Sequence, residues 1–164
     1  MGKARSGPVM KTLLAIAIVG ITTISNAETL SFPSFRIEVG DGWAHSLERE
    51  SQAHSELGQL ISIYHPNRNG ILKIQPYNPP AFVSPAILRN MTNVESSTTL
   101  SWQKWGDYSG YQYDYAEGGS FFRQWWLTNE RTIIFIVHES DTESRNIEID
   151  EVNKIVNSIT VNTP

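Results

Sequence analysis

The side chains that could perform catalysis are few in this sequence and widely separated. There is no Cys, so composition excludes a thiol nucleophile, a zinc–thiolate site and a disulfide. The four His residues show no pair at metal-ligand spacing on a helix; they are His45, His54, His65 and His138. Ligand-type side chains are adjacent from His138 to Asp141, but at a strand end this pattern is more typical of a solvated turn. We expect no metal site and no cofactor.

The segment from Gly106 to Gly110 contains the hydroxyl of Ser109 between glycines, but not in the G-x-S-x-G order of a nucleophile elbow. We place Ser109 in a hairpin loop rather than at a strand-to-helix turn. The sequence also contains no glycine-rich phosphate-binding loop. A hydrolase of the cell envelope would need a His and a carboxylate brought together from distant strands. We therefore expect the protein not to be an enzyme.

Aromatic side chains are a stronger signal, because residues 102–126 hold ten of the 17 aromatic residues of the chain. Packing in the core explains Tyr111, Phe122 and Trp126. Tryptophan and tyrosine are also enriched in binding hot spots, so other aromatic residues of this segment could form a recognition surface with neighbouring charged groups. The candidate binding residues are Trp102, Trp105, Tyr108, Asp114, Arg123, Trp125 and His138.

Turn-forming residues divide the first half of the chain into short elements. The predicted strands are residues 35–39, 43–49, 60–65 and 71–75, with a polar loop at 51–58. A four-residue loop between the third and fourth strands would place Ile63 opposite Ile74. Ser84 and Pro85 are a typical N-cap and first helical residue, which predicts a helix through Met91.

Two hairpins are predicted between residues 108 and 138. The glycine pair at 118–119 suggests a two-residue loop. This register places Asp114 opposite Arg123, and Tyr111 opposite Trp126. Opposite charges and aromatic rings are thus paired across the strands, which favours this register.

A second tight turn, at residues 129–130, would pair Thr128 with Arg131 and Trp126 with Ile133. The two hairpins then have two distinct faces. We assign one face to the core; it contains Tyr111, Tyr113, Tyr115, Phe122, Trp126, Ile133, Phe135 and Val137. The other face is too apolar to lie open to water, yet it carries charge, so a helix or a ligand must partly cover it. This mixed face contains Gln112, Asp114, Arg123, Trp125, Leu127, Ile134, Ile136 and His138.

Residues 147–159 are predicted to form an amphipathic helix that packs on the sheet. Its apolar positions are Ile147, Val152, Ile155, Val156 and Ile159. Acidic residues lie near its start and Lys154 near its end, as the helix dipole favours. Residues 160–164 are expected to form a loose tail.

The N-terminus has the organisation of a cleavable secretory signal peptide. Basic residues precede a short apolar run at 13–21, and Ser25-Asn26-Ala27 provides small residues at the two positions that signal cleavage requires. Such a run is about half as long as a bilayer-spanning helix. We expect a Sec-type signal peptide at 1–27, a single domain at 28–164, and no stable membrane anchor after cleavage. Because Cys is absent, a lipid anchor on this residue type is excluded.

The predicted mature chain is acidic. Three of the 13 basic residues and none of the 17 acidic residues precede residue 28, which leaves a formal charge of −7. An acidic domain is repelled by phosphate backbones, so we expect no nucleic-acid partner. An exported protein without disulfides fits a bacterial periplasm better than a eukaryotic extracellular space.

This arrangement resembles the Mog1/PsbP-like superfamily, including its periplasmic DcrB-like branch. The similarity rests on Gly40–Trp43 after the opening strand, the helix 85–91, the aromatic middle strand 121–127, and the closing sequence Ile155–Ile159. Asp41 replaces the proline that is usual in the family. The resemblance implies an α+β domain with an antiparallel sheet of about six to eight strands flanked by helices, an α/β/α sandwich. It also implies action by binding other macromolecules, and it transfers no active-site residues.

The expected function is that of an exported, non-catalytic periplasmic binding protein whose partner is another protein of the cell envelope. An immunity-type inhibitor and an accessory subunit of an envelope complex both fit this description. The alternative is a periplasmic protein that binds a small ligand or a glycan. In that case exposed aromatic rings would stack on the ligand, and Asp114, Arg123 and His138 would supply polar anchors.

Overall fold

The computed structural model describes residues 27–48, 58–143 and 145–162. Residues 1–26 of the predicted signal peptide and 51–57 of the predicted polar loop lie outside these ranges. The elements are β1 (Glu28–Ser31), β2 (Phe35–Val39), β3 (Ala44–Glu48), β4 (Leu60–Tyr64), β5 (Ile71–Tyr77), α1 (Pro85–Met91), β6 (Gln103–Trp105), β7 (Tyr108–Glu117), β8 (Ser120–Thr128), β9 (Ile133–Asp141), α2 (Arg145–Asn157) and β10 (Thr160–Val161). The predicted α+β class with an antiparallel sheet is confirmed.

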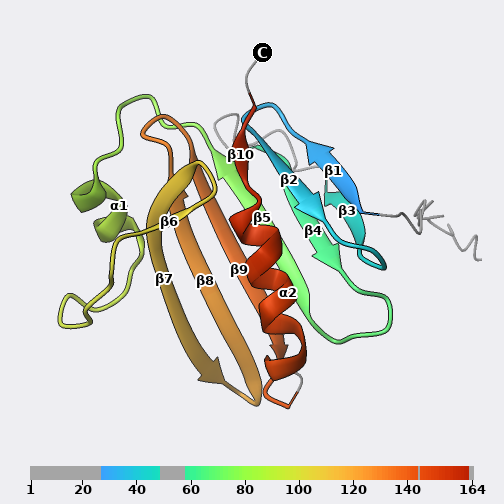
Figure 1. Cartoon of the computed structure of the whole chain (residues 1–164). Coiled ribbons are helices and arrows are strands. Elements are labelled where there is room, and N and C mark those ends of the chain that lie inside the picture. Colours follow the sequence, from blue (N-terminus) through green and yellow to red (C-terminus); the bar gives the residue numbers. More distant parts are fainter. Residues whose placement is uncertain (1–26, 49–57, 144, 163–164) are drawn as a thin grey trace, which may run out of the picture.

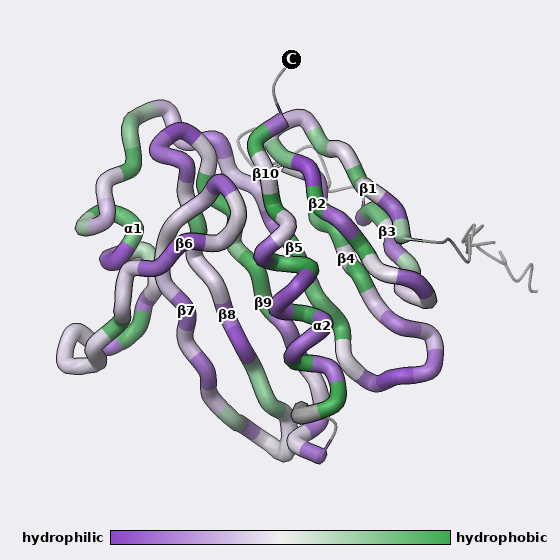
Figure 2. The backbone as a smooth tube through the Cα atoms, viewed as in Figure 1, coloured by the Kyte–Doolittle hydropathy of each residue, from purple (hydrophilic) through white to green (hydrophobic). Residues whose placement is uncertain are grey.

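The described strands form two antiparallel sheets. The larger has seven strands in the order β3-β4-β5-β9-β8-β7-β6, and the smaller has the order β1-β2-β10. Helix α2 lies in front of the larger sheet, beside the smaller one (Figure 1). Hydrophobic and hydrophilic positions alternate along α2 (Figure 2). Its Val152, Ile155 and Val156 join the main core, together with residues of β2 and of the large sheet. The helix and the small sheet therefore cover one face of the large sheet.

We call the face of the large sheet under α2 the closed face, and the opposite one the open face. The closed face carries Trp125, Leu127, Ile134, Ile136 and His138, which are all fully buried. The closed face is the mixed face that was predicted from the sequence. Of the two covers expected for it, a helix or a ligand, the structure has the helix.

The assignment of the core to the other face was wrong in part. Tyr111, Trp126 and Ile133 are buried there, in a second and smaller cluster beneath α1. The remaining members of that set are only half-buried: Tyr113, Tyr115, Phe122, Phe135 and Val137. The aliphatic residues of α2 and of the small sheet pack on the charged face instead, because its charged groups have partners within the fold.

The hairpin registers were predicted correctly at one of three turns. The pairs Asp114–Arg123 and Tyr111–Trp126 are present as predicted. Gly118 and Gly119 have φ of 59° and 90°, the left-handed values that a two-residue turn of this kind requires.

The other two registers are shifted by two residues. Thr128 pairs with Ile133, and Ile63 pairs with Leu72. At the first of these turns, the Asn129 side chain accepts hydrogen bonds from the backbone N–H groups of Arg131 and Thr132, which stabilises a four-residue loop. At the second, His65 Nδ1 accepts from the backbone N–H of Asn67. A shift of two preserves which face each side chain occupies.

The helices agree with the sequence except at the ends of α2. Ser84 caps α1 by accepting a hydrogen bond from the Ile87 N–H at 3.3 Å. Ile147 does not pack on the sheet as predicted, since 68% of its surface is exposed. The predicted loose tail is also corrected, because Thr160 and Val161 pair with β2 as β10. The Asp107 carboxylate accepts a hydrogen bond from the Val161 N–H at 3.0 Å and so ties this strand to the β6–β7 turn.

Candidate functional site

An aromatic groove lies on the open face of the large sheet, between β7, β8 and β9 and the segment that follows α1. It consists of two pockets that share Met91, Trp126 and Phe135. The first has a volume of about 680 Å³ and is lined also by Thr92, Asn93, Val94, Glu95, Thr98, Tyr113, Tyr115 and Gln124. The second has a volume of about 390 Å³ and is lined also by Gln75, Tyr77 and Ile133. We call these two pockets together the aromatic groove.

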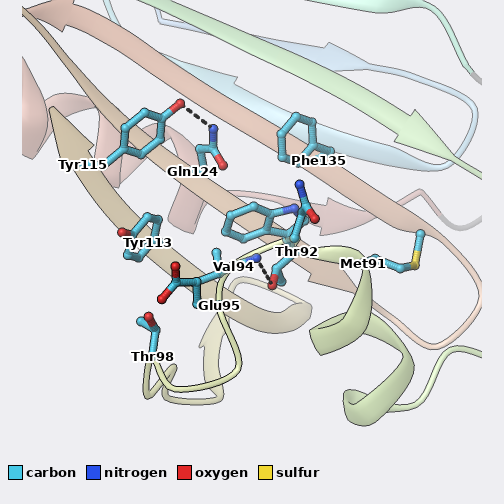
Figure 3. A pocket seen from close by; sticks show the side chains of 11 residues that line it. Met91, Thr92, Val94, Glu95, Thr98, Tyr113, Tyr115, Gln124 and Phe135 are labelled. Carbon is cyan, nitrogen blue, oxygen red and sulfur yellow. Dashed lines mark hydrogen bonds between the residues drawn. The ribbon is translucent and has the colours of Figure 1, made fainter. Parts of the chain in front are cut away.

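Alternation along the strands places the aromatic rings of the groove. Tyr113 and Tyr115 are two residues apart on β7, so both point to the open face. Their rings stack with centroids 5.9 Å apart, and the Tyr115 ring stacks on Phe122 at 4.8 Å. The Gln124 amide donates to the Tyr115 hydroxyl at 3.0 Å, which fixes the ring beside the first pocket (Figure 3).

The opposite wall of the groove is a loop held by Arg89. From α1 its guanidinium donates to the backbone carbonyls of Val94, Glu95 and Thr98 at 2.9–3.0 Å. It also donates to the Thr92 hydroxyl at 2.9 Å. A single planar donor thus fixes the whole turn after α1. The carboxylate of Glu95 is left pointing towards the groove, beside Tyr113 (Figure 3).

The candidate binding residues of the sequence are not brought together on one surface. Trp105, Tyr108, Trp125 and His138 are buried on the closed face, with at most 5% of any of them exposed. The Tyr108 hydroxyl donates to the Ser34 carbonyl at 2.9 Å. Burial, with a smaller contribution from Asp107, raises the pKa of Tyr108 to about 12. These side chains stabilise the fold in this conformation, and they present no surface to a partner.

The charged candidates lie on the closed face as well. The Arg123 Nε donates to Asp114 at 2.7 Å, and its Nη1 donates to Asn153 of α2 at 3.1 Å. Asp114 and Arg123 are therefore a cross-strand ion pair at the border of the helix. Of the seven candidate binding residues, only Trp102 lies on the open face, where 41% of its surface is exposed. Its ring packs edge-on against the ring of Tyr111, with centroids 5.1 Å apart.

A buried polar pair lies beneath α2. His138 Nε2 is 3.4 Å from the carboxylate of Glu148, which also accepts from the Gly70 N–H at 3.3 Å. Desolvation lowers the pKa of His138, although Glu148 opposes this change. Both residues are at most 1% exposed, so they hold the helix to the sheet out of reach of a substrate.

Another polar cluster connects the hairpin after β4 to α2. Arg68 forms a bidentate ion pair with Glu151 at 2.9 and 3.0 Å, and the Trp43 indole donates to the same carboxylate. The hydrogen bonds from Arg68 lower the pKa of Glu151. The Arg68 guanidinium and the Trp43 indole thus attach α2 to the β4–β5 hairpin and to the start of β3.

Within the described ranges, no group of three or more His, Asp or Glu side chains could hold a metal ion. In the same ranges, no helix is long and apolar enough to cross a membrane.

Comparison with solved structures identifies the fold. A protein from Bacteroides thetaiotaomicron superposes with a TM-score of 0.55 and 13% identity over 87% of this chain. This chain spans only 48% of that protein. LpqN, which is involved in cell envelope biogenesis of Mycobacterium tuberculosis, superposes with a TM-score of 0.50 and 16% identity over 84% of this chain and 91% of LpqN. The chain has a Mog1/PsbP-like fold.

The PsbP (CyanoP) of Synechocystis is also among the structural neighbours. It aligns with 90% of this chain and 99% of its own length, with 11% identity and a TM-score of 0.49. No protein-family model matches the sequence, and no curated protein matches it either. At these identities the likeness concerns the Mog1/PsbP-like fold alone.

Sequence reasoning missed the aromatic groove because it assigned the groove residues to the core. Tyr113, Tyr115 and Phe135 lie at alternating positions, a pattern typical of a buried face. Periodicity alone does not show how completely other elements of the fold cover that face. One signal was present. The predicted amphipathic helix 147–159 follows β9, and one helix can cover only one face of a sheet.

Proposed function

We propose that this chain is exported to the periplasm and acts without catalysis, by binding another protein of the cell envelope through the aromatic groove. One observation carries the proposal: half-buried aromatic rings line a groove on the one face of the large sheet that α2 does not cover. Tyrosine and tryptophan are enriched in binding hot spots. An immunity-type inhibitor and an accessory subunit of an envelope complex both remain compatible with this role.

The chemistry of the described residues supports a binding role over catalysis. The polar pairs of the closed face are used in packing, and the described residues that line the groove include no His and one carboxylate, that of Glu95. LpqN shares the fold and is described as involved in cell envelope biogenesis, which makes an envelope context reasonable for this chain too. The predicted signal peptide supports the same location.

A matched pair of exposed apolar residues tests the proposal. Met91 lies in the groove with 46% of its surface exposed, and Ile147 lies on α2 with 68% exposed. The double variant Met91→Ser and Tyr113→Ser should lose a protein partner that the tagged wild-type chain retains from envelope extracts. Ile147→Ser should retain it. Equal retention by both variants, with unchanged circular dichroism, would show that the groove is not the binding site.

A glycan or small ligand is the second candidate, because the first pocket falls within the volume range of ligand sites, about 300–1,000 Å³. A thermal-shift screen against envelope glycans distinguishes the two. Stabilisation of the wild-type chain that the groove variant lacks would favour the ligand over the protein partner.

A further inference from the structure

The aromatic groove has two chemically different ends. The end next to β5 is apolar and is formed by Tyr77, Ile133, Phe135 and Met91, with Gln75 at its border. The end next to the Arg89-held loop is polar and contains Thr98, Gln124 and the carboxylate of Glu95. Trp126 lines both ends. A ligand that fills the groove must therefore combine an apolar group with a polar one.

The charge of the polar end is negative. Among the residues that the structure describes, neither pocket is lined by Lys or Arg, and Glu95 is the only charged residue of their linings. The Arg89 guanidinium donates to three backbone carbonyls, that of Glu95 among them, and to the Thr92 hydroxyl. That carboxylate accepts a long hydrogen bond from the Ser97 hydroxyl, at 3.4 Å. It is exposed and therefore has acceptor capacity for a ligand.

The aromatic rings add to this negative potential. Faces of aromatic rings attract cations through the ring quadrupole. In the described part of the chain, Arg68 lies over Trp43 and Arg123 over Phe121, and both contacts are outside the groove. Tyr113, which stacks on Tyr115, lies next to the Glu95 carboxylate (Figure 3).

The surroundings have the same sign. Alternation along the described strands places four carboxylates on the open face, those of Glu48, Glu117, Glu139 and Asp141, against two cations, Lys73 and Lys104. Residues 28–164 carry a formal charge of −7. Complementarity across an interface then requires a basic partner surface.

We propose that the aromatic groove binds a segment of the partner protein in which a Lys or Arg side chain is next to an apolar one. The cationic group lies between the Glu95 carboxylate and the Tyr113 ring. The apolar side chain fills the end formed by Met91, Ile133 and Phe135. This inference rests on the proposed function, since it names the chemistry of the partner that the groove would take.

The test uses a short capped peptide in which Arg and Leu alternate, titrated into isotope-labelled protein expressed from the full chain. Chemical shifts should change at Tyr113, Trp126 and Phe135. Matched peptides with citrulline or Glu in place of Arg should leave these signals unchanged. Binding should weaken as salt is raised, because exposed ion pairs are screened.

Two variants that remove one negative charge each separate the groove from general attraction to an acidic protein. Glu95→Gln alters the groove, and Asp150→Asn alters an exposed carboxylate on α2. Glu95→Gln should weaken binding of the Arg–Leu peptide roughly fivefold, the loss expected for one exposed ion pair. Asp150→Asn should leave its affinity unchanged. Equal effects of the two variants, or shifts clustered on α2, would overturn the proposal.

The outcome is distinguishable from a failure of the proposed function. If the Arg–Leu peptide leaves the groove signals unchanged while the Met91 and Tyr113 double variant loses its protein partner, the cationic chemistry is wrong and the binding site is right. If the peptide binds in the groove while the double variant retains every protein partner, the groove recognises cations and the proposed function is wrong.

Discussion

The two faces of the large sheet differ in how their polar and aromatic groups are used. On the closed face, charged groups are paired: Arg123 with Asp114, which are half-buried, and His138 with Glu148, which are fully buried. On the open face, aromatic rings are half-buried, and the Glu95 carboxylate is exposed beside them. A face that carries charge can therefore be the core, and a face that carries aromatic rings can be the surface. Partners, rather than residue type alone, decide which face is closed.

The largest expected effect compares two tryptophans that the sequence placed in one group. Trp125 is fully buried on the closed face, whereas Trp102 is 41% exposed on the open face. Trp125→Ala should lower the free energy of unfolding by about 3–5 kcal/mol through cavity formation. Trp102→Ala should lower it by about 1 kcal/mol, the value of one aromatic pair. Urea unfolding curves measure both, and equal losses would mean that the two faces do not differ as described.

Removal of the Arg89 guanidinium should affect the groove more than the core. Arg89→Ala leaves four acceptors of the loop after α1 without this donor, and we expect a loss of about 1.5–3 kcal/mol. Hydrogen exchange should accelerate at residues 92–98 and remain unchanged in α2. Faster exchange in α2 would indicate that Arg89 stabilises the whole domain.

The buried pair under α2 should make stability depend on pH. Desolvation lowers the pKa of His138 in the folded protein, so the unfolded chain binds a proton more readily as the pH falls below about 6.5. The free energy of unfolding should therefore decrease as the pH falls from about 7 to about 5. His138→Gln should flatten this decrease, and His45→Gln on β3 is the control. An unchanged slope in the His138 variant would contradict the account of the pair.

The smallest effect is expected at the ion pair of Arg68 with Glu151, whose side chains are 25% and 40% exposed. Exposed pairs contribute at most about 1 kcal/mol, because water screens them. Arg68→Ala should cause a loss of this size, which high salt should reduce. A loss as large as that of Trp125→Ala would show that this cluster belongs energetically to the core.

The sequence predicted local structure where one residue type determines the conformation. Ser84 with Pro85 predicted the start of α1, and the glycine pair at 118–119 predicted the first register. The second register was missed because Asn129 stabilises a longer turn with its own side chain. Backbone turn propensities do not include such hydrogen bonds from a side chain to the neighbouring backbone.

The site was harder to predict than the fold, because it depends on which face receives α2. Side chains of β7, β8 and β9 alternate between the two faces of the sheet, and both faces are rich in apolar residues. The choice depends on long-range packing of α2 and β2 against Ile134 and Ile136, and on a partner for His138 some ten residues away. The sequence therefore indicates Trp125 as a binding residue, whereas it is buried in the core, and it indicates Tyr113 as a core residue, whereas it lines the groove.

The most direct test of the difference between the faces is hydrogen exchange of this chain with and without its captured protein partner. Binding through the aromatic groove predicts protection at residues 91–98 and along Tyr111 to Tyr115 of β7. The outer surface of α2 should exchange as in the free chain. Protection confined to α2 or to the small sheet would contradict the assignment of the open face as the binding face.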